Sequence, residues 1–334
     1  MDPKIAARFN DDILQATMQR YTIAPNQIHL LDGFESFIYE FQRLDGDYIL
    51  RIGHSSRRTP AMIHGEVDWI NYLSDHNVTV ARAILSESRN LVEPIDDGHG
   101  EAFLATAFVK ARGGIPKRDK INEGLFLNYG RLLGRMHALA KDYTPSNPSW
   151  KRYTWDSPIN NTPDRQLPPS ETLIRQKYQA VFTHLQTLPT HRDAYGMIHQ
   201  DAHTGNLFVD DDYVMTLFDF DDCVYGHFIY DIAMVMFYIA GWGGEDIPGF
   251  TERFMSVFLE GYRQYNHLDL VWLREIPHFL KLREIDLFAA ILYTMGENPT
   301  DAWCARYMQG RREKIMNDVP FIAFNWDSLE KYIN

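Results

Sequence analysis

The sequence is poor in cysteine and contains no long apolar run. Only Cys223 and Cys304 occur in 334 residues, so no disulfide framework is implied and a reducing cytoplasm is the expected compartment. The apolar run "IAMVMFYIA" at 232–240 has about half the length that a membrane-spanning helix needs, which predicts a buried helix instead. The first residues, "MDPKIAARFNDDILQATMQR", mix charged and apolar side chains and lack the apolar core of a signal peptide. We therefore expect a cytoplasmic protein without a membrane partner.

Basic residues are also scarce relative to acidic ones. The chain has 33 Lys and Arg against 45 Asp and Glu, a formal net charge of −12. Nucleic acids and anionic membranes repel such a surface, so a nonspecific role on either is excluded. A hydrophobic content of 45% over 334 residues is enough for two globular domains with substantial cores, and the sequence shows no internal repeat or low-complexity tract.

The first hundred-odd residues predict a small antiparallel sheet that carries one main helix. A helix at 10–20 precedes two strands at 37–43 and 47–52, which join at Asp45-Gly46, a strong hairpin-turn pair. Further strands are expected in "ARAIL", "NLVEPI" and "EAFLATAFV". The main helix is indicated by apolar residues at helical spacing, namely Ile63, Val67, Ile70 and Leu73.

The remainder of the chain predicts mainly helices. Two adjacent glycines end the segment "KARGG" at 110–114 and favour a flexible connection there. Residues 143–170 are rich in proline and polar side chains, which predicts an irregular segment between helical ones. We expect an α+β protein with an N-terminal domain at 1–109, a hinge at 110–114 and a larger, mainly helical domain at 115–334.

The segment at 197–222 concentrates polar residues beside apolar strands. We expect the stretch "NLFVDDDYVMTLFDF" to form a hairpin that turns at 210–212, with Asn206 at the start of one strand and Asp219 at the end of the other. This arrangement brings an amide oxygen and a carboxylate to one rim, next to Asp201. Oxygen ligands of this kind suit Mg²⁺, and a neighbouring carboxylate can accept a proton from a hydroxyl during phosphate transfer.

The spacing of these residues resembles that of a known enzyme group. His199, Asp201 and Asn206 form H-x-D-x-x-x-x-N, and Asp219 follows in "LFDFDD". Together with "YDIA" at 230–233, this pattern is similar to the aminoglycoside phosphotransferase and choline kinase group of the protein-kinase-like fold. The resemblance implies a two-lobed enzyme in which Asp201 is the catalytic base and Asn206 and Asp219 hold Mg²⁺.

The resemblance also implies how ATP is bound. Arg51 in "YILRI" stands where the family has a basic phosphate-binding side chain, and Glu66 stands where a helical Glu pairs with it. Gly33 and Ser36 in "LDGFESFIYEF" are the expected phosphate-covering loop, although this loop is not a G-x-G-x-x-G. The adenine is expected against the backbone of Phe108 to Lys110, again by family analogy.

Several of these residues have other interpretations. His199 is expected to support the loop, whereas His203 either does the same or lines the acceptor pocket. Asp221 assists a second ion or the acceptor, or more simply faces solvent. Asp231 is expected at a helix N-cap, where the family resemblance implies that it braces the catalytic loop. Outside the family context, Arg51 and Glu66 are an ordinary surface ion pair.

The sequence therefore predicts an ATP- and Mg²⁺-dependent phosphotransferase acting on a hydroxyl of a small molecule. Alternatives are a Ser/Thr protein kinase of the bacterial stress-response type, a metal-dependent hydrolase that uses "HQDAH" as ligands, and a silent nucleotide-binding module. Acidic residues in the C-terminal part suit an amine-bearing acceptor, or are only a solvated face. They are Glu245, Asp246, Glu252, Glu260, Asp269, Glu284 and Asp286.

Overall fold

The computed structural model describes residues 3–31, 33, 35–117, 121–160, 162–240 and 246–333. Contacts divide the chain into two compact units, which we describe separately. The first unit comprises Met1–Gly114, Tyr143–Arg152 and Phe208–Asp221, and the second comprises Ile115–Asp142, Tyr153–Leu207 and Asp222–Asn334. The first unit therefore includes two short segments from beyond the predicted hinge.

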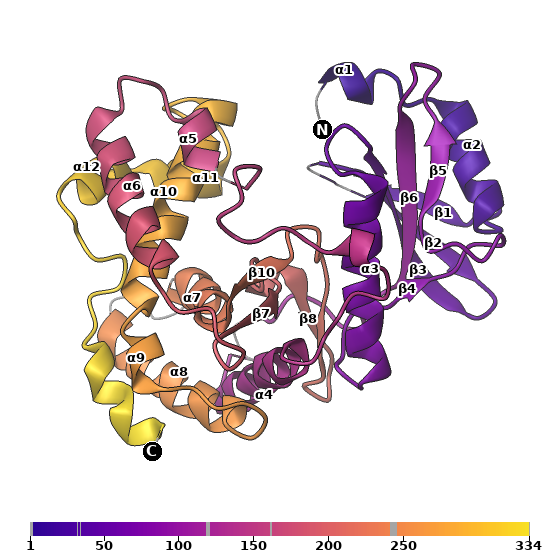
Figure 1. Ribbon diagram of the computed structural model, residues 1–334. Coiled ribbons are helices and arrows are strands. Elements are labelled where there is room, and N and C mark those ends of the chain that lie inside the picture. Colours follow the sequence, from indigo (N-terminus) through magenta and orange to yellow (C-terminus); the bar gives the residue numbers. More distant parts are fainter. Residues whose placement is uncertain are drawn as a thin grey trace. The chain divides into compact units, whose positions relative to one another are not determined.

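An antiparallel sheet and two main helices form most of the first unit (Figure 1). The strand order is β1-β2-β3-β6-β4, and β5 also pairs with β6. The helices are α1 (Pro3–Ala6), α2 (Asp11–Arg20) and α3 (Pro60–Asp75), and the strands are β1 (Ile28–Leu31), β2 (Phe37–Arg43), β3 (Gly46–His54), β4 (Ala83–Ile84), β5 (Glu93–Asp96) and β6 (Ala102–Val109). The predicted helices and strands of this region are confirmed.

Alternation along β3 separates the core of this unit from its charged side chains. Leu50 and Ile52 are buried in one cluster with Tyr21, which follows α2 and donates a hydrogen bond to the Ala105 carbonyl at 3.1 Å. Successive side chains of a strand point to opposite faces, so Arg51 lies on the other face of the sheet. That face is the one on which α3 lies (Figure 1).

Two predicted turns differ from the structure in detail. Arg43 pairs directly with Gly46, so the central residues of the first hairpin turn are Leu44 and Asp45 rather than Asp45 and Gly46. The second hairpin is formed by β8 (Leu207–Val209) and β9 (Met215–Leu217), as predicted. Its turn extends to Val214, because the Asp210 carboxylate accepts hydrogen bonds from the backbone N–H groups of both Asp212 and Val214.

The second unit is mainly helical, as predicted. It contains one small antiparallel pair, β7 (Tyr195–Ile198) with β10 (Val224–His227). Its helices are α4 (Glu123–Ala140), α5 (Thr162–Gln166), α6 (Thr172–Gln186), α7 (Phe228–Ile239), α8 (Ile247–Tyr262), α9 (Leu270–Leu273), α10 (Ile276–Met295), α11 (Ala302–Met308) and α12 (Arg311–Met316), with 3-10 turns at Thr204–Asn206 and Trp326–Tyr332.

Close backbone packing joins two of these helices. Gly130 on α4 lies against the Phe258 carbonyl of α8, and Gly261 on α8 lies against the Leu127 carbonyl of α4. A side chain at either glycine would collide with the facing backbone, so glycine is required at both positions. The apolar run at 232–240 falls mostly on α7, whose residues are buried almost throughout.

The segment predicted to be irregular contains short helices. A 3-10 turn at Pro148–Trp150 and the helix α5 interrupt residues 143–170. The 3-10 turn has proline in its first turn, where the fixed φ of proline favours helix initiation. A search of the helices in the described ranges finds none that is both long and apolar enough to cross a membrane.

Candidate active site

In the first unit, Arg51 and Glu66 form a buried ion pair. The two guanidinium nitrogens of Arg51 on β3 donate to the two carboxylate oxygens of Glu66 on α3, at 2.8 and 2.6 Å. The side chains are only 11% and 1% exposed. The alternative of an ordinary surface pair is therefore wrong. The fork of arginine matches a carboxylate bidentately, which fixes the direction of the guanidinium.

Asp221 lies among arginines of the same unit. The expectation that it faces solvent is wrong, because its side chain is only 15% exposed. Arg57 donates to its Oδ2 at 2.5 Å, and Arg58 lies 3.3 Å from the same oxygen. Both arginines follow β3 directly, so the chain supplies positive charge just where Asp221 is buried. Burial alone would raise the pKa of Asp221, but Arg51, Arg58 and Arg57 more than offset it and hold the pKa well below its ordinary value.

Asp219 follows β9 by two residues and has a left-handed backbone, with φ of 64°. Burial would lower the pKa of Arg51, but the charges of Glu66, Asp221 and Asp219 outweigh burial and raise it. Arg51 is thus fully charged, and Asp219 contributes to the field around it. Arg51, Glu66, Asp219 and Asp221 thus lie near one another within the first unit, and their roles stay a prediction.

The predicted phosphate-covering loop has a tight backbone at its described positions. Any side chain at Gly33 would collide with the Ser36 carbonyl. The Ser36 hydroxyl faces Gly53 on β3, 3.4 Å from where a Cβ would stand. Gly33 therefore lets the Ser36 carbonyl approach the start of this loop, and Gly53 lets the Ser36 hydroxyl approach β3.

The segment Phe108–Lys110 is already hydrogen-bonded within the first unit. The backbone N–H of Val109 donates to the Arg82 carbonyl at 2.8 Å, and that of Lys110 donates to the Asp47 carbonyl at 3.0 Å. The Lys110 ammonium pairs with Glu40 at 2.6 Å, while the Phe108 ring lies under the Arg51 guanidinium at 5.2 Å. The backbone N–H groups of Val109 and Lys110 therefore already have acceptors within this unit, and the contact of this segment with adenine stays a prediction.

In the second unit, a buried carboxylate organises the loop that follows β7. Asp231 accepts hydrogen bonds from the backbone N–H groups of His199 and Gln200 at 2.9 and 2.7 Å, and its Oδ2 lies 3.2 Å from His137 Nε2. Asp231 is the fourth residue of α7 rather than its N-cap, because the helix begins three residues earlier, at Phe228. The N-cap expectation is therefore wrong. The His199 ring is fully buried and accepts from the Asp201 N–H at 3.2 Å.

Asp201 is held by two basic groups of the same unit. Arg283 on α10 donates to Oδ1 at 2.8 Å, and His203 Nε2 lies 3.4 Å from Oδ2. Burial alone would raise the pKa of Asp201, but Arg283, His203 and His199 more than offset it and lower the pKa well below its ordinary value. Asp201 is therefore ionised throughout the physiological pH range.

Asn206 is oriented by the same loop. Its side-chain NH₂ donates to the Asp201 carbonyl at 3.0 Å, and its backbone N–H donates to the His203 carbonyl at 3.0 Å. The side-chain amide nitrogen of Asn206 thus bonds to the loop backbone, so the side-chain amide oxygen is the atom that can bind a ligand. It is also the atom that a hard cation would use.

Aromatic side chains surround the second basic partner of Asp201. The rings of His203 and Tyr238 lie 4.2 Å apart, and the Tyr238 hydroxyl accepts a hydrogen bond from Arg283 at 2.5 Å. Trp303 on α11 extends this group, parallel to Tyr238 at 6.5 Å, and is 45% exposed. Tyr238, Arg283 and Trp303 were not predicted from the sequence. They lie on three different helices, α7, α10 and α11, so no local sequence pattern connects them.

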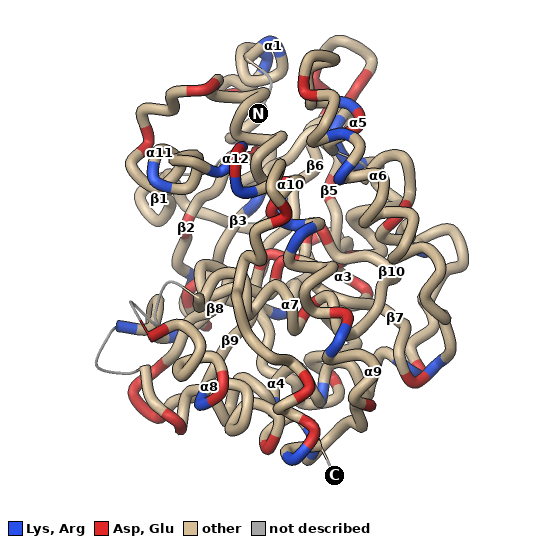
Figure 2. The backbone as a smooth tube through the Cα atoms, turned by 90° about the vertical axis from the view of Figure 1, so that its left-hand side faces the viewer, with Lys and Arg blue, Asp and Glu red and all other residues tan. Residues whose placement is uncertain are grey.

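The acidic residues of the C-terminal part do not form one solvated face. Glu284 is fully buried and pairs with Lys281 and Arg311, at 2.6 and 2.7 Å. Figure 2 shows acidic and basic residues side by side around α10 and α12. Asp246 caps α8, Asp269 pairs with the nearby His267, and Glu252 pairs with Lys331 near the C-terminus. Glu245 lies outside the described residues.

The hydrolase alternative finds no support in the part of the chain that the structure describes. Within these residues, two groups of three side chains have ligand atoms close enough for a metal ion. Neither group includes a residue of the "HQDAH" segment. In that segment, His199 is buried and its Nδ1 is bound by a backbone N–H.

Comparisons with known proteins identify relatives of this chain. A family model described as "Phosphotransferase enzyme family" matches residues 28–268. Amicoumacin kinase of Bacillus subtilis (strain 168) is 33% identical over 327 residues, which are 96% of this chain and 96% of that protein.

Two solved structures show the same fold. An amicoumacin kinase in complex with AMP-PNP, Ca²⁺ and Ami superimposes with a TM-score of 0.93 at 33% identity, covering 98% of this chain and 100% of that chain. A microcompartment-associated aminopropanol kinase superimposes with a TM-score of 0.70 at 22% identity, covering 92% and 98% of the two chains. The predicted resemblance and the protein-kinase-like fold are confirmed. The chain belongs to the phosphotransferase enzyme family and is a small-molecule phosphotransferase.

Proposed function

We propose that this enzyme transfers the γ-phosphate of ATP, with Mg²⁺, to a hydroxyl of a small molecule, and that Asp201 is its catalytic base. The observation that carries the proposal is the ionised carboxylate of Asp201, held by Arg283 and His203 beside the amide of Asn206. A nucleotide analogue and a divalent cation are present in the amicoumacin kinase complex, which supports the same requirements here.

The residues proposed to hold the cation fit a hard metal ion. The amide nitrogen of Asn206 is used by the Asp201 carbonyl, so its oxygen is the remaining ligand atom, and Asp219 supplies a carboxylate. Oxygen donors of this kind, completed by water and phosphate oxygens, are what Mg²⁺ prefers. When bound, the ion supplies positive charge that neutralises the phosphate oxygens during transfer.

Asp201 is proposed to orient the acceptor hydroxyl by accepting its hydrogen bond. Its lowered pKa makes it a weak base in the ground state, so proton transfer to it occurs late, as the phosphate–oxygen bond forms. Arg283 and His203 keep the carboxylate in one position. Removal of Asp201 should therefore reduce turnover by about 10²–10⁴-fold, the usual contribution of general base catalysis.

The nucleotide phosphates are proposed to bind in the first unit. Glu66 fixes the guanidinium of Arg51 at 2.6 and 2.8 Å, and the resulting rigid cation can contact phosphate oxygens bidentately. Gly33 and Ser36 are proposed to cover the phosphates. On this division, residues 1–109 bind the nucleotide, 110–114 are the hinge, and 115–334 carry the acceptor site.

We propose that the acceptor is an amine-bearing alcohol, with amicoumacin as the first compound to test. The relatives are an amicoumacin kinase and an aminopropanol kinase. The aromatic group formed by Tyr238, His203 and Trp303 offers ring faces near Asp201, which suit a cation or a planar ring. No comparison or described contact favours a protein substrate. The compartment is proposed to be the cytoplasm, where ATP is available.

The experiment that tests this function follows ADP release from Mg-ATP with a panel of acceptors. The panel contains amicoumacin, 1-amino-2-propanol, an aminoglycoside, choline, a pentose and a generic protein. Asp201→Ala should abolish acceptor-dependent release and leave nucleotide binding nearly unchanged. Asp212→Ala, which removes an exposed carboxylate of the β8–β9 turn, is the matched control. Equal turnover by Asp201→Ala and the parent enzyme with the true acceptor would refute the assignment.

A further inference from the structure

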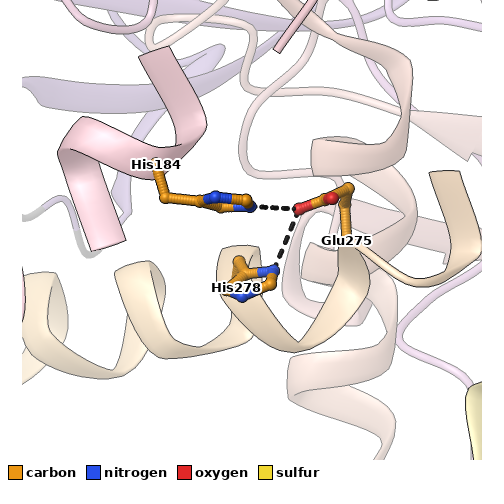
Figure 3. A group of neighbouring side chains, drawn as sticks. All are labelled: His184, Glu275 and His278. Atoms are coloured by element: carbon orange, nitrogen blue, oxygen red, sulfur yellow. Dashed lines mark hydrogen bonds and ion pairs between the residues drawn. The ribbon is translucent and has the colours of Figure 1, made fainter. Parts of the chain in front are cut away.

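Three side chains of the second unit, none of them proposed for catalysis, converge in space (Figure 3). The Nε2 atom of His184 lies 2.8 Å from Oε2 of Glu275, and the Nδ1 atom of His278 lies 2.9 Å from the same oxygen. The two imidazole rings are 4.2 Å apart. Two ring nitrogens and one carboxylate oxygen are thus directed at one small volume.

Two packed helices hold these side chains. His184 lies in the last turn of α6, and its carbonyl accepts hydrogen bonds from both the N–H and the hydroxyl of Thr187. Glu275 immediately precedes α10, and His278 lies in its first turn, with the His278 N–H bonded to the Glu275 carbonyl at 3.0 Å. Helical residues three positions apart project to the same side, so Glu275 and His278 share one face.

Ordinary hydrogen bonding does not account for the arrangement. His184 is hydrogen-bonded to Glu275, but the Nδ1 atom of His278 is buried and makes no hydrogen bond of suitable geometry within the described residues. A buried polar atom without a hydrogen bond destabilises the folded protein. The Glu275 oxygen lies 2.9 Å from this nitrogen without hydrogen-bond geometry, and a bound cation would give the nitrogen a directed bond.

The ligand types indicate which cation. Two imidazoles with one carboxylate form the ligand set of open zinc sites, whereas Mg²⁺ and Ca²⁺ prefer oxygen alone. Bonds of about 2.0–2.1 Å in a tetrahedron place ligand atoms about 3.3 Å apart. The two histidine nitrogens lie 2.8 and 2.9 Å from the Glu275 oxygen, so a bound ion would require these side chains to move apart slightly. The side chains of His184 and His278 are 40% and 43% exposed, which leaves room for a water molecule as fourth ligand.

We propose that His184, Glu275 and His278 bind a borderline divalent cation, with Zn²⁺ the best fit, at a second site independent of the catalytic metal. The ion would join the end of α6 to the start of α10. The same helix α10 carries Arg283 five residues further on, so the site fixes the end of the helix that reaches Asp201.

The second group of possible ligands does not support a similar proposal. His54, Asp97 and Glu101 in the first unit also bring their ligand atoms together. A guanidinium nitrogen of Arg8, however, already donates to Asp97 and Glu101 at 2.8 and 2.9 Å. This cation neutralises both carboxylates, and a metal ion would have to displace it.

The test is a titration of the chelator-stripped full-length protein with Zn²⁺, without nucleotide, in competition with a chromophoric chelator. We expect one equivalent to bind, and Co²⁺ in its place to give the intense visible absorption of tetrahedral coordination. His184→Gln and His278→Gln should each weaken binding at least ~10-fold, since each removes one ligand. His267→Gln is the matched control, because His267 pairs with Asp269 at 2.7 Å on the surface without a third ligand within the described residues.

The outcome that overturns the site is equal Zn²⁺ binding by the parent, His184→Gln and His278→Gln, or no binding by the parent below ~100 μM. Circular dichroism checks that each variant is folded. Should a variant not fold, modification of histidines in the parent protein decides instead: Zn²⁺ should protect His184 and His278 from diethyl pyrocarbonate but leave His267 reactive. None of these measurements uses phosphate transfer. A negative result for the proposed kinase activity would therefore not affect the test of Zn²⁺ binding, and a negative result for Zn²⁺ binding would not affect the test of kinase activity.

Discussion

The guanidinium of Arg283 donates to the Asp201 carboxylate at 2.8 Å and to the Tyr238 hydroxyl at 2.5 Å. A residue of α10 therefore sets the charge state of the proposed catalytic base, which lies 82 positions earlier in the chain. The bond places one oxygen of Asp201 in a fixed direction and keeps the group ionised. It also links the first half of α10, where the proposed Zn²⁺ site begins, to the catalytic loop.

The first prediction concerns the pH dependence of the rate. In the parent enzyme the lowered pKa of Asp201 keeps it ionised well below neutral pH. Arg283→Gln removes the largest opposing charge, so burial would raise this pKa, and the acid limb of kcat/KM should move to higher pH by about 1–3 units. Arg274→Gln, which breaks an exposed pair with Asp327, is the control and should leave the profile unchanged. Coincident profiles for Arg283→Gln and the parent would contradict this role.

The second prediction concerns the ion pair between Arg51 and Glu66. Glu66→Ala leaves a buried guanidinium without its partner and should lower the free energy of unfolding by about 3–5 kcal/mol. It should also raise the KM for ATP, because the direction of Arg51 is no longer fixed. Asp45→Ala, which breaks the exposed pair with Arg43 at 3.0 Å, should leave stability nearly unchanged. Urea unfolding measures the stability, and ATP saturation curves measure the KM. Equal losses of stability in Glu66→Ala and Asp45→Ala would refute a special role for the buried pair.

The sequence predicted well where a pattern was local. The alternation of β3 and the helical spacing of α3 were sufficient to bring Arg51 and Glu66 to one face. The proximity of His199, Asp201 and Asn206 was predictable because they lie within eight residues and bond to one another through the loop backbone. In such cases secondary structure alone determines which side chains meet.

The sequence did not predict contacts between a site residue and a residue on a distant helix. It also did not predict burial that depends on such a distant contact. Arg283 and Tyr238 belong to different helices of the second unit, and only helix packing brings them to Asp201. Asp221 looked like an exposed carboxylate in "DFDD", because nothing local shows that Arg57 and Arg58 fold onto it. The turn between β2 and β3 lies one residue earlier than predicted. Its centre is set by the register of the two strands, in which Arg43 pairs with Gly46, and not by the Asp45-Gly46 pair.

The third prediction concerns the contact between α4 and α8. Gly130→Ala places a methyl group into the Phe258 carbonyl, so the two helices must separate. We expect a loss of about 1–3 kcal/mol in the free energy of unfolding, as for other overpacked sites. Gly114→Ala, where no atom lies within 4 Å of the new methyl group, should be within ~0.5 kcal/mol of the parent. A parent-like urea midpoint for Gly130→Ala would show that the helices do not approach this closely.

The last prediction concerns Asp286, which lies one turn beyond Arg283 on α10. Burial raises its pKa to about 7, although Arg283 acts in the opposite direction. A carboxyl whose pKa is higher in the folded state binds its proton more tightly there, so stability falls as the pH rises from about 4 to 7. Asp286→Asn cannot ionise and should exceed the parent by roughly 1–3 kcal/mol at pH 8, while the two should be nearly equal at pH 4. Urea unfolding across this range measures the difference, with Asp212→Asn as an exposed control, and a gap that does not vary with pH would exclude ionisation of Asp286 as its cause.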